Sequence, residues 1–137
     1  MTGTPKVLII DDDQDYRTSV RALLESRGYT VIEAESGQQG LEKLVSKRPA
    51  LIILDIVMKS SCEGYGIAWM IRNKEEYEEF RGVPILMTSS IDQSPDERFA
   101  MCPEAELIRP DYYLAKPLDI PRFFELVESL TGAAAAC

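Results

Sequence analysis

The chain has 137 residues, of which 45% are hydrophobic and 28% charged, a composition typical of one globular domain. Its net charge of −8 argues against a nucleic-acid surface, and its apolar runs are too short to span a membrane. The absence of histidine excludes Ser-His-Asp catalysis, and the three widely spaced cysteines disfavour a structural zinc site. Because no export signal is visible, the sequence predicts a cytoplasmic protein that contacts neither nucleic acid nor membrane.

The chain begins with a strand pattern followed by a helix pattern. Residues 7–10 form a continuous apolar run, as expected of a buried strand. Apolar residues then recur at helical spacing between Tyr16 and Leu24, and Gly28 suits the position just past a helix end. Asp13 and Asp15 are expected to cap or favour the start of this helix.

A second strand and a second helix follow. Residues 30–34 are predicted to form the strand. Ser36 is expected to cap the helix, and Pro49 is expected to end it. The apolar residues of this helix are Leu41, Leu44 and Val45.

Two further strands enclose a long helix in the middle of the chain. Residues 51–54 and 84–87 are apolar runs of strand length. Between them the pattern predicts a helix from about Tyr65 to Phe80, in which the glutamates from 75 to 79 form a solvated surface. Its buried face is expected to carry Trp69, Met70 and Ile71.

The last part of the chain is expected to add one strand and one or two helices. Residues 91–110 are predicted to contain one helix, near 95–101. A fifth strand at 112–115 precedes a final helix that begins near Asp119, with Pro121 in its first turn. One face of this helix carries Phe123, Val127 and Leu130.

This alternation predicts an α/β fold with a five-stranded parallel sheet and helices on both faces. Right-handed crossovers favour the doubly wound, flavodoxin-like strand order 2-1-3-4-5. We expect one domain over residues 6–131, between an N-terminal extension at 1–5 and a short tail at 132–137. In this order the first and third strands flank the point where the winding reverses, which is where open α/β sheets bind ligands.

Polar side chains follow four of these strands. The first strand ends in Asp11 and Asp12, the third in Asp55, the fourth in Thr88 and the fifth in Lys116. Carboxylates that converge in a buried place need a positive partner, and all-oxygen ligation with open positions suits Mg²⁺. With the metal bound, a carboxylate can attack a phosphoryl donor and become an aspartyl phosphate. Asp55 stands alone on the central strand and is the candidate nucleophile.

Four motifs occur in order at these strand ends: Val7–Asp13, Leu51–Met58, Pro84–Ser89 and Leu114–Leu118. Together they resemble the receiver domain of two-component response regulators, the CheY-like family, over residues 6 to about 131. The resemblance implies that Asp55 accepts a phosphoryl group from a sensor histidine kinase or a histidine phosphotransfer protein. It implies a stand-alone switch that signals to a downstream protein and has no enzymatic activity beyond its own phosphorylation and dephosphorylation.

The resemblance also implies a metal site. Asp12 would bind Mg²⁺ directly and Asp11 through water, while Asp55 and the Val57 backbone carbonyl would complete the protein ligands. The Val57 side chain is apolar where many receivers carry a polar residue near the attacking water. This difference predicts a phosphorylated lifetime longer than that of fast chemotaxis regulators.

A second implied group surrounds the phosphoryl position. Thr88 and Lys116 would clasp the phosphoryl group, and Ser89 would lie at the access to the site. Tyr113 would be the aromatic switch residue, whose ring moves inward when Thr88 is drawn toward the phosphate. Such a switch is an equilibrium between two packings that new contacts at the site can bias.

Two alternatives belong to other functional classes. A haloacid-dehalogenase-type phosphatase is one, because Asp11-x-Asp13 faintly resembles its nucleophile motif, but Asp55 would then be unexplained. The other is an interaction module that keeps the fold and works without phosphorylation. The presence of the acid pair, Asp55, Thr88 and Lys116 argues against this second alternative.

Overall fold

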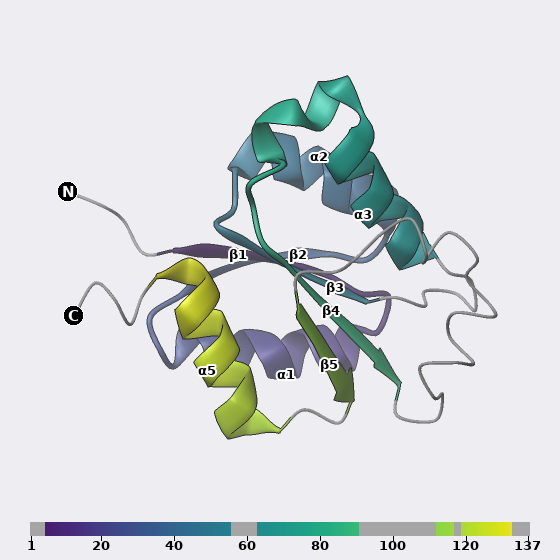
Figure 1. The fold of residues 1–137 in the computed structure, drawn as a ribbon. Helices are drawn as coiled ribbons and strands as arrows, with labels where there is room; N and C mark the ends of the chain where they lie inside the picture. The colour runs from purple at the N-terminus through teal and green to yellow at the C-terminus, as the bar shows by residue number, and fades with distance from the viewer. Residues whose placement is uncertain (1–4, 56–62, 91–111, 117–118, 133–137) are drawn as a thin grey trace.

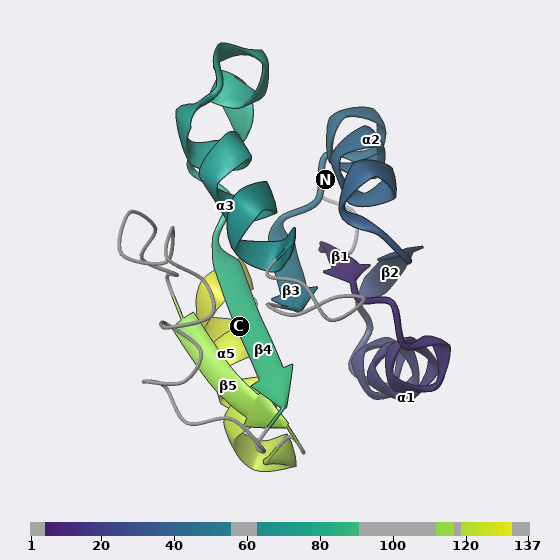
Figure 2. The same cartoon turned by 90° about the vertical axis from the view of Figure 1, so that its right-hand side faces the viewer.

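The fold is a single parallel sheet of five strands in the order β2-β1-β3-β4-β5 (Figure 1). It was obtained as a computed structural model, which describes residues 5–55, 63–90, 112–116 and 119–132. The described elements are β1 (Lys6–Ile10), α1 (Gln14–Glu25), β2 (Thr30–Ala34), α2 (Gly37–Lys47), β3 (Leu51–Asp55), α3 (Glu63–Asn73), the 3₁₀ helix η1 (Glu75–Phe80), β4 (Ile85–Ser90), β5 (Tyr112–Lys116) and α5 (Ile120–Thr131). The predicted doubly wound order is therefore confirmed, and Figure 2 shows the strands side by side in this order.

Helices cover both faces of the sheet, with α2 and α3 on one face and α1 and α5 on the other (Figure 1). Successive side chains of a strand point to opposite faces, so each strand contributes to two cores. In β1, Leu8 and Ile10 pack with residues of α2 and α3, whereas Val7 and Ile9 pack with residues of α1 and α5. Because both faces are covered, β1 is apolar from Val7 to Ile10 and β3 from Leu51 to Leu54.

Local signals define where the helices begin. The side chain of Asp13 accepts a hydrogen bond from the backbone N–H of Tyr16, and Ser36 does the same for Gln39. Asp119 caps α5 in the same way, through the backbone N–H of Arg122. Each cap satisfies a backbone donor that lacks a partner inside its helix. The predicted starts of these three helices are confirmed.

Helix α2 packs closely on the strand that leads to the acid pair. Gly40 faces the side chain of Ile10, and a Cβ atom added at Gly40 would collide with it. The missing side chain lets α2 approach the end of β1 directly before Asp11. Leu41 and Leu44 are buried on this face, whereas Val45 is 46% exposed.

The predicted continuous helix from Tyr65 to Phe80 is wrong. Helix α3 ends at Asn73, Lys74 has extended backbone angles, and the 3₁₀ helix η1 follows. The clustered glutamates of η1 repel one another at helical spacing, which weakens a continuous helix. The break turns the chain back, so that Phe80 is buried in the core and Arg72 donates hydrogen bonds to the carbonyls of Arg81 and Val83.

The predicted buried face of α3 is partly wrong as well. Ile71 is fully buried and Met70 is partly buried against the core, but Trp69 is 38% exposed. The other buried residues of α3 on this side are Ile67 and Ala68. Ile67 and Ala68 precede Ile71 by four and three residues, which places all three on one side of the helix, whereas three consecutive residues spread around it. The glutamates of η1 are exposed as predicted, whereas the helix predicted near 95–101 lies outside the described residues. None of the helices that the structure describes is long and apolar enough to cross a bilayer.

The turn between α1 and β2 gives a first testable prediction. Gly28 has a φ of +87°, and the backbone N–H of the next residue, Tyr29, donates to the Leu24 carbonyl. Gly28→Ala should therefore lower the free energy of unfolding by about 1 kcal/mol, because a side chain is strained at positive φ even in open space. Urea unfolding followed by circular dichroism measures the change.

The matched control for this substitution is Gly82→Ala. Gly82 has no positive φ, and an added Cβ would also meet open space there. This variant should unfold within about 0.5 kcal/mol of the wild type. Equal stabilities of the two variants would contradict the strain at Gly28.

Candidate functional site

The site lies where the carboxyl ends of β1, β3 and β4 meet. Asp11 follows β1 directly, Asp55 is the last residue of β3, and the register pairs Ile10 with Leu54 and Asp55 with Thr88. Parallel strands end at the same edge of a sheet, so these residues stand in a row at that edge. Residues far apart in the sequence thus become neighbours.

Three carboxylates converge at this edge. Asp11, Asp12 and Asp55 each contribute an oxygen atom, and these atoms lie within 4.8 Å of one another. Asp11 and Asp55 are buried, with exposed fractions of 1% and 5%, while Asp12 is exposed to solvent. Negative charges this close repel one another unless a cation lies between them. The oxygen-only donor set, with one side open to water, has the chemistry that Mg²⁺ prefers.

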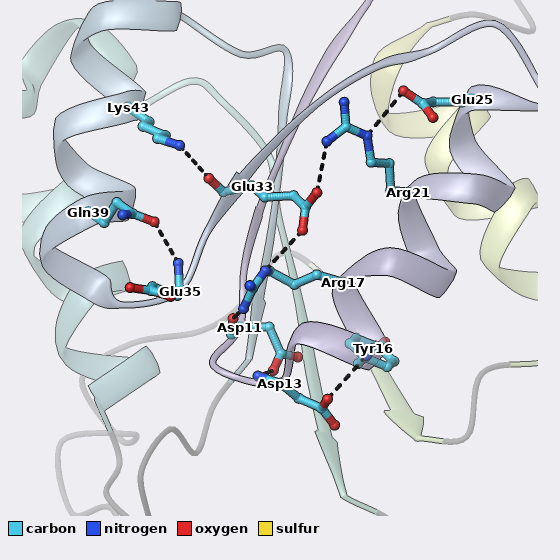
Figure 3. A network of polar contacts seen from close by, with 10 residues as sticks. All are labelled: Asp11, Asp13, Tyr16, Arg17, Arg21, Glu25, Glu33, Glu35, Gln39 and Lys43. Atoms are coloured by element: carbon cyan, nitrogen blue, oxygen red, sulfur yellow. Dashed lines mark hydrogen bonds and ion pairs between the residues drawn. The ribbon is translucent and has the colours of Figure 1, made fainter.

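Hydrogen bonds hold the β1–α1 turn in this arrangement. The Asp11 carboxylate accepts a hydrogen bond from the backbone N–H of Asp13 at 2.9 Å. The backbone carbonyl of Asp11 accepts a hydrogen bond of 2.6 Å from Nη1 of Arg17, whose guanidinium is buried beneath the turn (Figure 3). Arg17 therefore brings a positive charge next to the acid cluster and fixes its backbone.

Arg17 is itself held by Glu33 of β2. The Glu33 carboxylate accepts hydrogen bonds from Nε of Arg17 at 3.0 Å and from Nη1 of Arg21 at 2.8 Å (Figure 3). Burial acts to raise the pKa of Glu33, but the hydrogen bonds from the two guanidinium groups outweigh it and lower the pKa. The Glu33 backbone carbonyl accepts a further hydrogen bond from Lys43, so β2 links α1 to α2.

Two hydroxyl groups lie beside the carboxylates. Thr88 is fully buried, and its hydroxyl makes no hydrogen bond of regular geometry with the residues that the structure describes. The hydroxyl of Tyr16 is buried too and lies close enough to Thr88 for the two to interact. Burial and the charges of Asp11 and Asp55 raise the pKa of Tyr16, and the contact with Thr88 only partly opposes this. The phenol is therefore neutral at physiological pH and can donate a hydrogen bond.

Sequence reasoning did not find Tyr16 as a site residue. It was assigned only to the apolar pattern of the first helix, where its ring does pack against the core. The available signal was its sequence separation from the acid pair. Tyr16 follows Asp12 by four residues, about one helical turn, so its side chain can return to the edge of the sheet where the acid pair lies. Arg17 and Glu33 were missed for a related reason, since ion pairs between a helix and a strand leave no spacing signature.

The remaining predicted site residues are described less fully. Ser89, Tyr113 and Lys116 are described as strand positions only, and the register pairs Met87 with Tyr113 and Ser90 with Lys116. Lys116 is the last residue of β5, which extends one residue beyond the prediction and ends at the same edge of the sheet. Val57 lies outside the described residues.

The comparisons with known proteins agree with this geometry. Residues 7–128 match the family model of the response regulator receiver domain. The chain belongs to this family. It is 29% identical over 134 residues to the polar-differentiation response regulator DivK of Brucella ovis, an alignment that covers 96% of this chain and 99% of DivK.

Solved receiver structures have the same fold. The chemotaxis protein CheY4 of Vibrio cholerae is 26% identical, with a TM-score of 0.75 over 93% of this chain and 99% of CheY4. The receiver domain of the Francisella response regulator 1452 is 22% identical, with a TM-score of 0.74 over 96% of this chain and 99% of that domain. The family match removes the haloacid-dehalogenase alternative, and Asp13, part of that motif, caps α1.

The Arg17–Glu33–Arg21 network predicts a pH-dependent contribution to stability. Glu33→Gln should lower the free energy of unfolding by roughly 1 to 2 kcal/mol at pH 7, because two charged hydrogen bonds lose their anion. The pKa of Glu33 is lower in the folded state, so this contribution is present at neutral pH and lost as the pH falls below about 4.5. Urea unfolding of both proteins between pH 3 and about pH 7 measures the difference.

Glu25→Gln is the control for this experiment. Glu25 pairs with the same Arg21, but both side chains are about half exposed, so its loss should cost at most about 0.5 kcal/mol. If the Glu33→Gln difference stayed constant from pH 7 to about pH 3, the charge of Glu33 would make no net contribution.

Proposed function

We propose that this receiver domain is a Mg²⁺-dependent phosphorylation switch in which Asp55 is the phosphoacceptor. The observation that carries the proposal is the convergence of the Asp11, Asp12 and Asp55 carboxylates within 4.8 Å, with Thr88 paired to Asp55 on the next strand. A buried carboxylate beside two others is poised to act as a nucleophile once a cation offsets the repulsion.

The proposed metal ligands are Asp12 directly, Asp11 through water, Asp55 and the Val57 carbonyl. The donor set fits Mg²⁺ because every described donor is oxygen and the exposed Asp12 leaves room for water molecules. When bound, Mg²⁺ would neutralise the acid cluster and the oxygens of the incoming phosphoryl group. Val57 and its effect on the phosphorylated lifetime remain predictions.

The phosphoryl group would come from a phosphohistidine of a sensor histidine kinase or a histidine phosphotransfer protein. An Asp55 carboxylate oxygen attacks phosphorus, a P–O bond forms, and the P–N bond to the histidine breaks, with the electron pair leaving on the imidazole. Thr88 and Lys116 hold the phosphoryl oxygens, and Ser89 controls access. These groups act by position and charge, as phosphoryl transfer requires.

The phosphorylated form would signal to a downstream protein in the cytoplasm. The contacts of Thr88 with the phosphoryl group bias the packing of Tyr113, and the altered surface is what the partner recognises. In this role the domain performs only its own phosphorylation and dephosphorylation and is not an enzyme acting on other substrates.

Intact-mass measurement tests the phosphoacceptor. Wild-type protein incubated with acetyl phosphate and Mg²⁺ should gain the mass of one phosphoryl group, and Asp55→Asn should gain none because the nucleophile is lost. Asp13→Asn is the control, because asparagine also caps helices and Asp13 is outside the carboxylate cluster. Full phosphorylation of Asp55→Asn, or none of the wild type, would overturn the proposal.

The acid cluster predicts that Asp12→Asn is more stable than the wild type without Mg²⁺ and less stable than the wild type with it. Without metal, Asp12→Asn should stabilise the fold by on the order of 0.5 kcal/mol, because one repelling charge is removed. With Mg²⁺ at a concentration of about 100 times its Kd, the wild type should gain about 2.7 kcal/mol and Asp12→Asn much less. Thermal unfolding with and without Mg²⁺ measures both effects.

Asp15→Asn is the matched control for the metal experiment. Asp15 is an exposed aspartate in the first turn of α1 and does not belong to the cluster. Asp15→Asn should lower the free energy of unfolding by about 0.3 kcal/mol, because a favourable interaction with the helix dipole is lost, and it should keep the full response to Mg²⁺. An equal loss of the Mg²⁺ response in both variants would argue against a ligand role for Asp12.

A further inference from the structure

Tyr16 carries a buried hydroxyl that the proposed mechanism does not use. Its ring packs against the core formed with α1 and α5, and its hydroxyl oxygen is buried at the edge of the sheet that carries the acid cluster. A buried hydroxyl is costly unless polar groups surround it. A phenylalanine would fill the apolar part of this position without that cost, so the hydroxyl calls for an explanation.

The surroundings of the Tyr16 hydroxyl are those of the proposed phosphoryl site. The charges of Asp11 and Asp55 act on the phenol, and the Thr88 hydroxyl is near enough to interact with it. These three residues are, respectively, a proposed metal ligand, the phosphoacceptor and a phosphoryl-binding hydroxyl. Figure 3 shows Tyr16 on α1 beside Asp11 and Asp13.

The charge state of the phenol fixes what it can do there. A tyrosine hydroxyl is protonated at neutral pH, so it can give a hydrogen bond to an anion without adding negative charge. A phosphoryl group on Asp55 would bring further negative charge into this place. Preorganised neutral donors in a buried site are effective at stabilising such charge.

We propose that Tyr16 is a further phosphoryl-binding residue, whose hydroxyl donates a hydrogen bond to a phosphoryl oxygen on Asp55. This inference rests on the proposed function. In the unphosphorylated domain the Tyr16 hydroxyl lies close enough to Thr88 to interact with it; on phosphorylation both hydroxyls would exchange this contact for phosphoryl oxygens. Tyr16 thereby couples the start of α1 to the same event that moves Thr88.

The helix start does not depend on the Tyr16 hydroxyl. It is the backbone N–H of Tyr16 that donates to Asp13, and the ring alone packs against the core. Tyr16→Phe therefore removes the donor and keeps both the cap and the packing. Tyr29→Phe is the matched control, because Tyr29 is also a buried tyrosine and its hydroxyl contacts Thr131, away from the acid cluster.

The experiment compares the wild type, Tyr16→Phe and Tyr29→Phe in binding of beryllium trifluoride, a phosphoryl mimic, at saturating Mg²⁺. Fluorine NMR titration gives its Kd, and a separate titration gives the Kd of Mg²⁺ alone. Tyr16→Phe should bind the mimic about tenfold more weakly, the effect of losing one hydrogen bond to a charged group. Its Mg²⁺ affinity should stay within about twofold of the wild type, because the hydroxyl is no metal ligand.

The outcomes separate this inference from the function on which it rests. If the wild type and Tyr16→Phe bind the mimic equally, the role of Tyr16 is overturned while the phosphoacceptor proposal stands. If the wild type binds no mimic and accepts no phosphoryl group from acetyl phosphate, both fall. A purely structural role would lower the melting temperature and weaken Mg²⁺ and mimic alike, which also overturns it.

A measurement on the wild type alone covers the case in which Tyr16→Phe does not fold. Carbon-13 labelling of the tyrosine rings lets NMR follow each ring during the titration with beryllium trifluoride. The Tyr16 ring signals should shift on binding of the mimic, and those of Tyr29 should not. An unshifted Tyr16 would overturn the inference.

Discussion

The arrangement of this domain depends on keeping mutually repelling carboxylates together at the end of buried strands. Asp11 and Asp55 terminate strands that are apolar on both faces, so neither can move into water without pulling its strand out of the core. The buried guanidinium of Arg17 supports this arrangement, because it donates a hydrogen bond to the Asp11 backbone carbonyl. Glu33 in turn holds Arg17, so the edge strand β2 supports the site that β1 and β3 present.

The parts of the fold that follow from local chemistry were predictable from the sequence. Ser36 and Asp119 mark helix starts because their side chains satisfy free backbone donors, and the apolar strand runs predict a covered parallel sheet. The handedness of the crossovers then restricts the strand order, which brings Asp11, Asp12 and Asp55 to one edge. For the same reason the carboxylate cluster could be predicted without any knowledge of distances.

What the sequence did not reveal depends on packing in three dimensions. The chain breaks at Lys74, where the clustered glutamates weaken the helix and Phe80 returns to the core, and the apolar spacing alone does not mark that break. Trp69 is apolar and was expected on the buried face of α3, but it is 38% exposed. Tyr16, Arg17 and Glu33 join the site through contacts between elements, which spacing along the chain does not encode.

The unequal exposure of the three aspartates determines how readily an ion can be exchanged. Asp12 is exposed to solvent, whereas Asp11 and Asp55 are buried, so a cation bound as proposed would meet Asp12 first and could keep part of its water shell. Departure by the same route would require no opening of the sheet. An ion bound there as proposed would be a replaceable reactant instead of a permanent part of the fold.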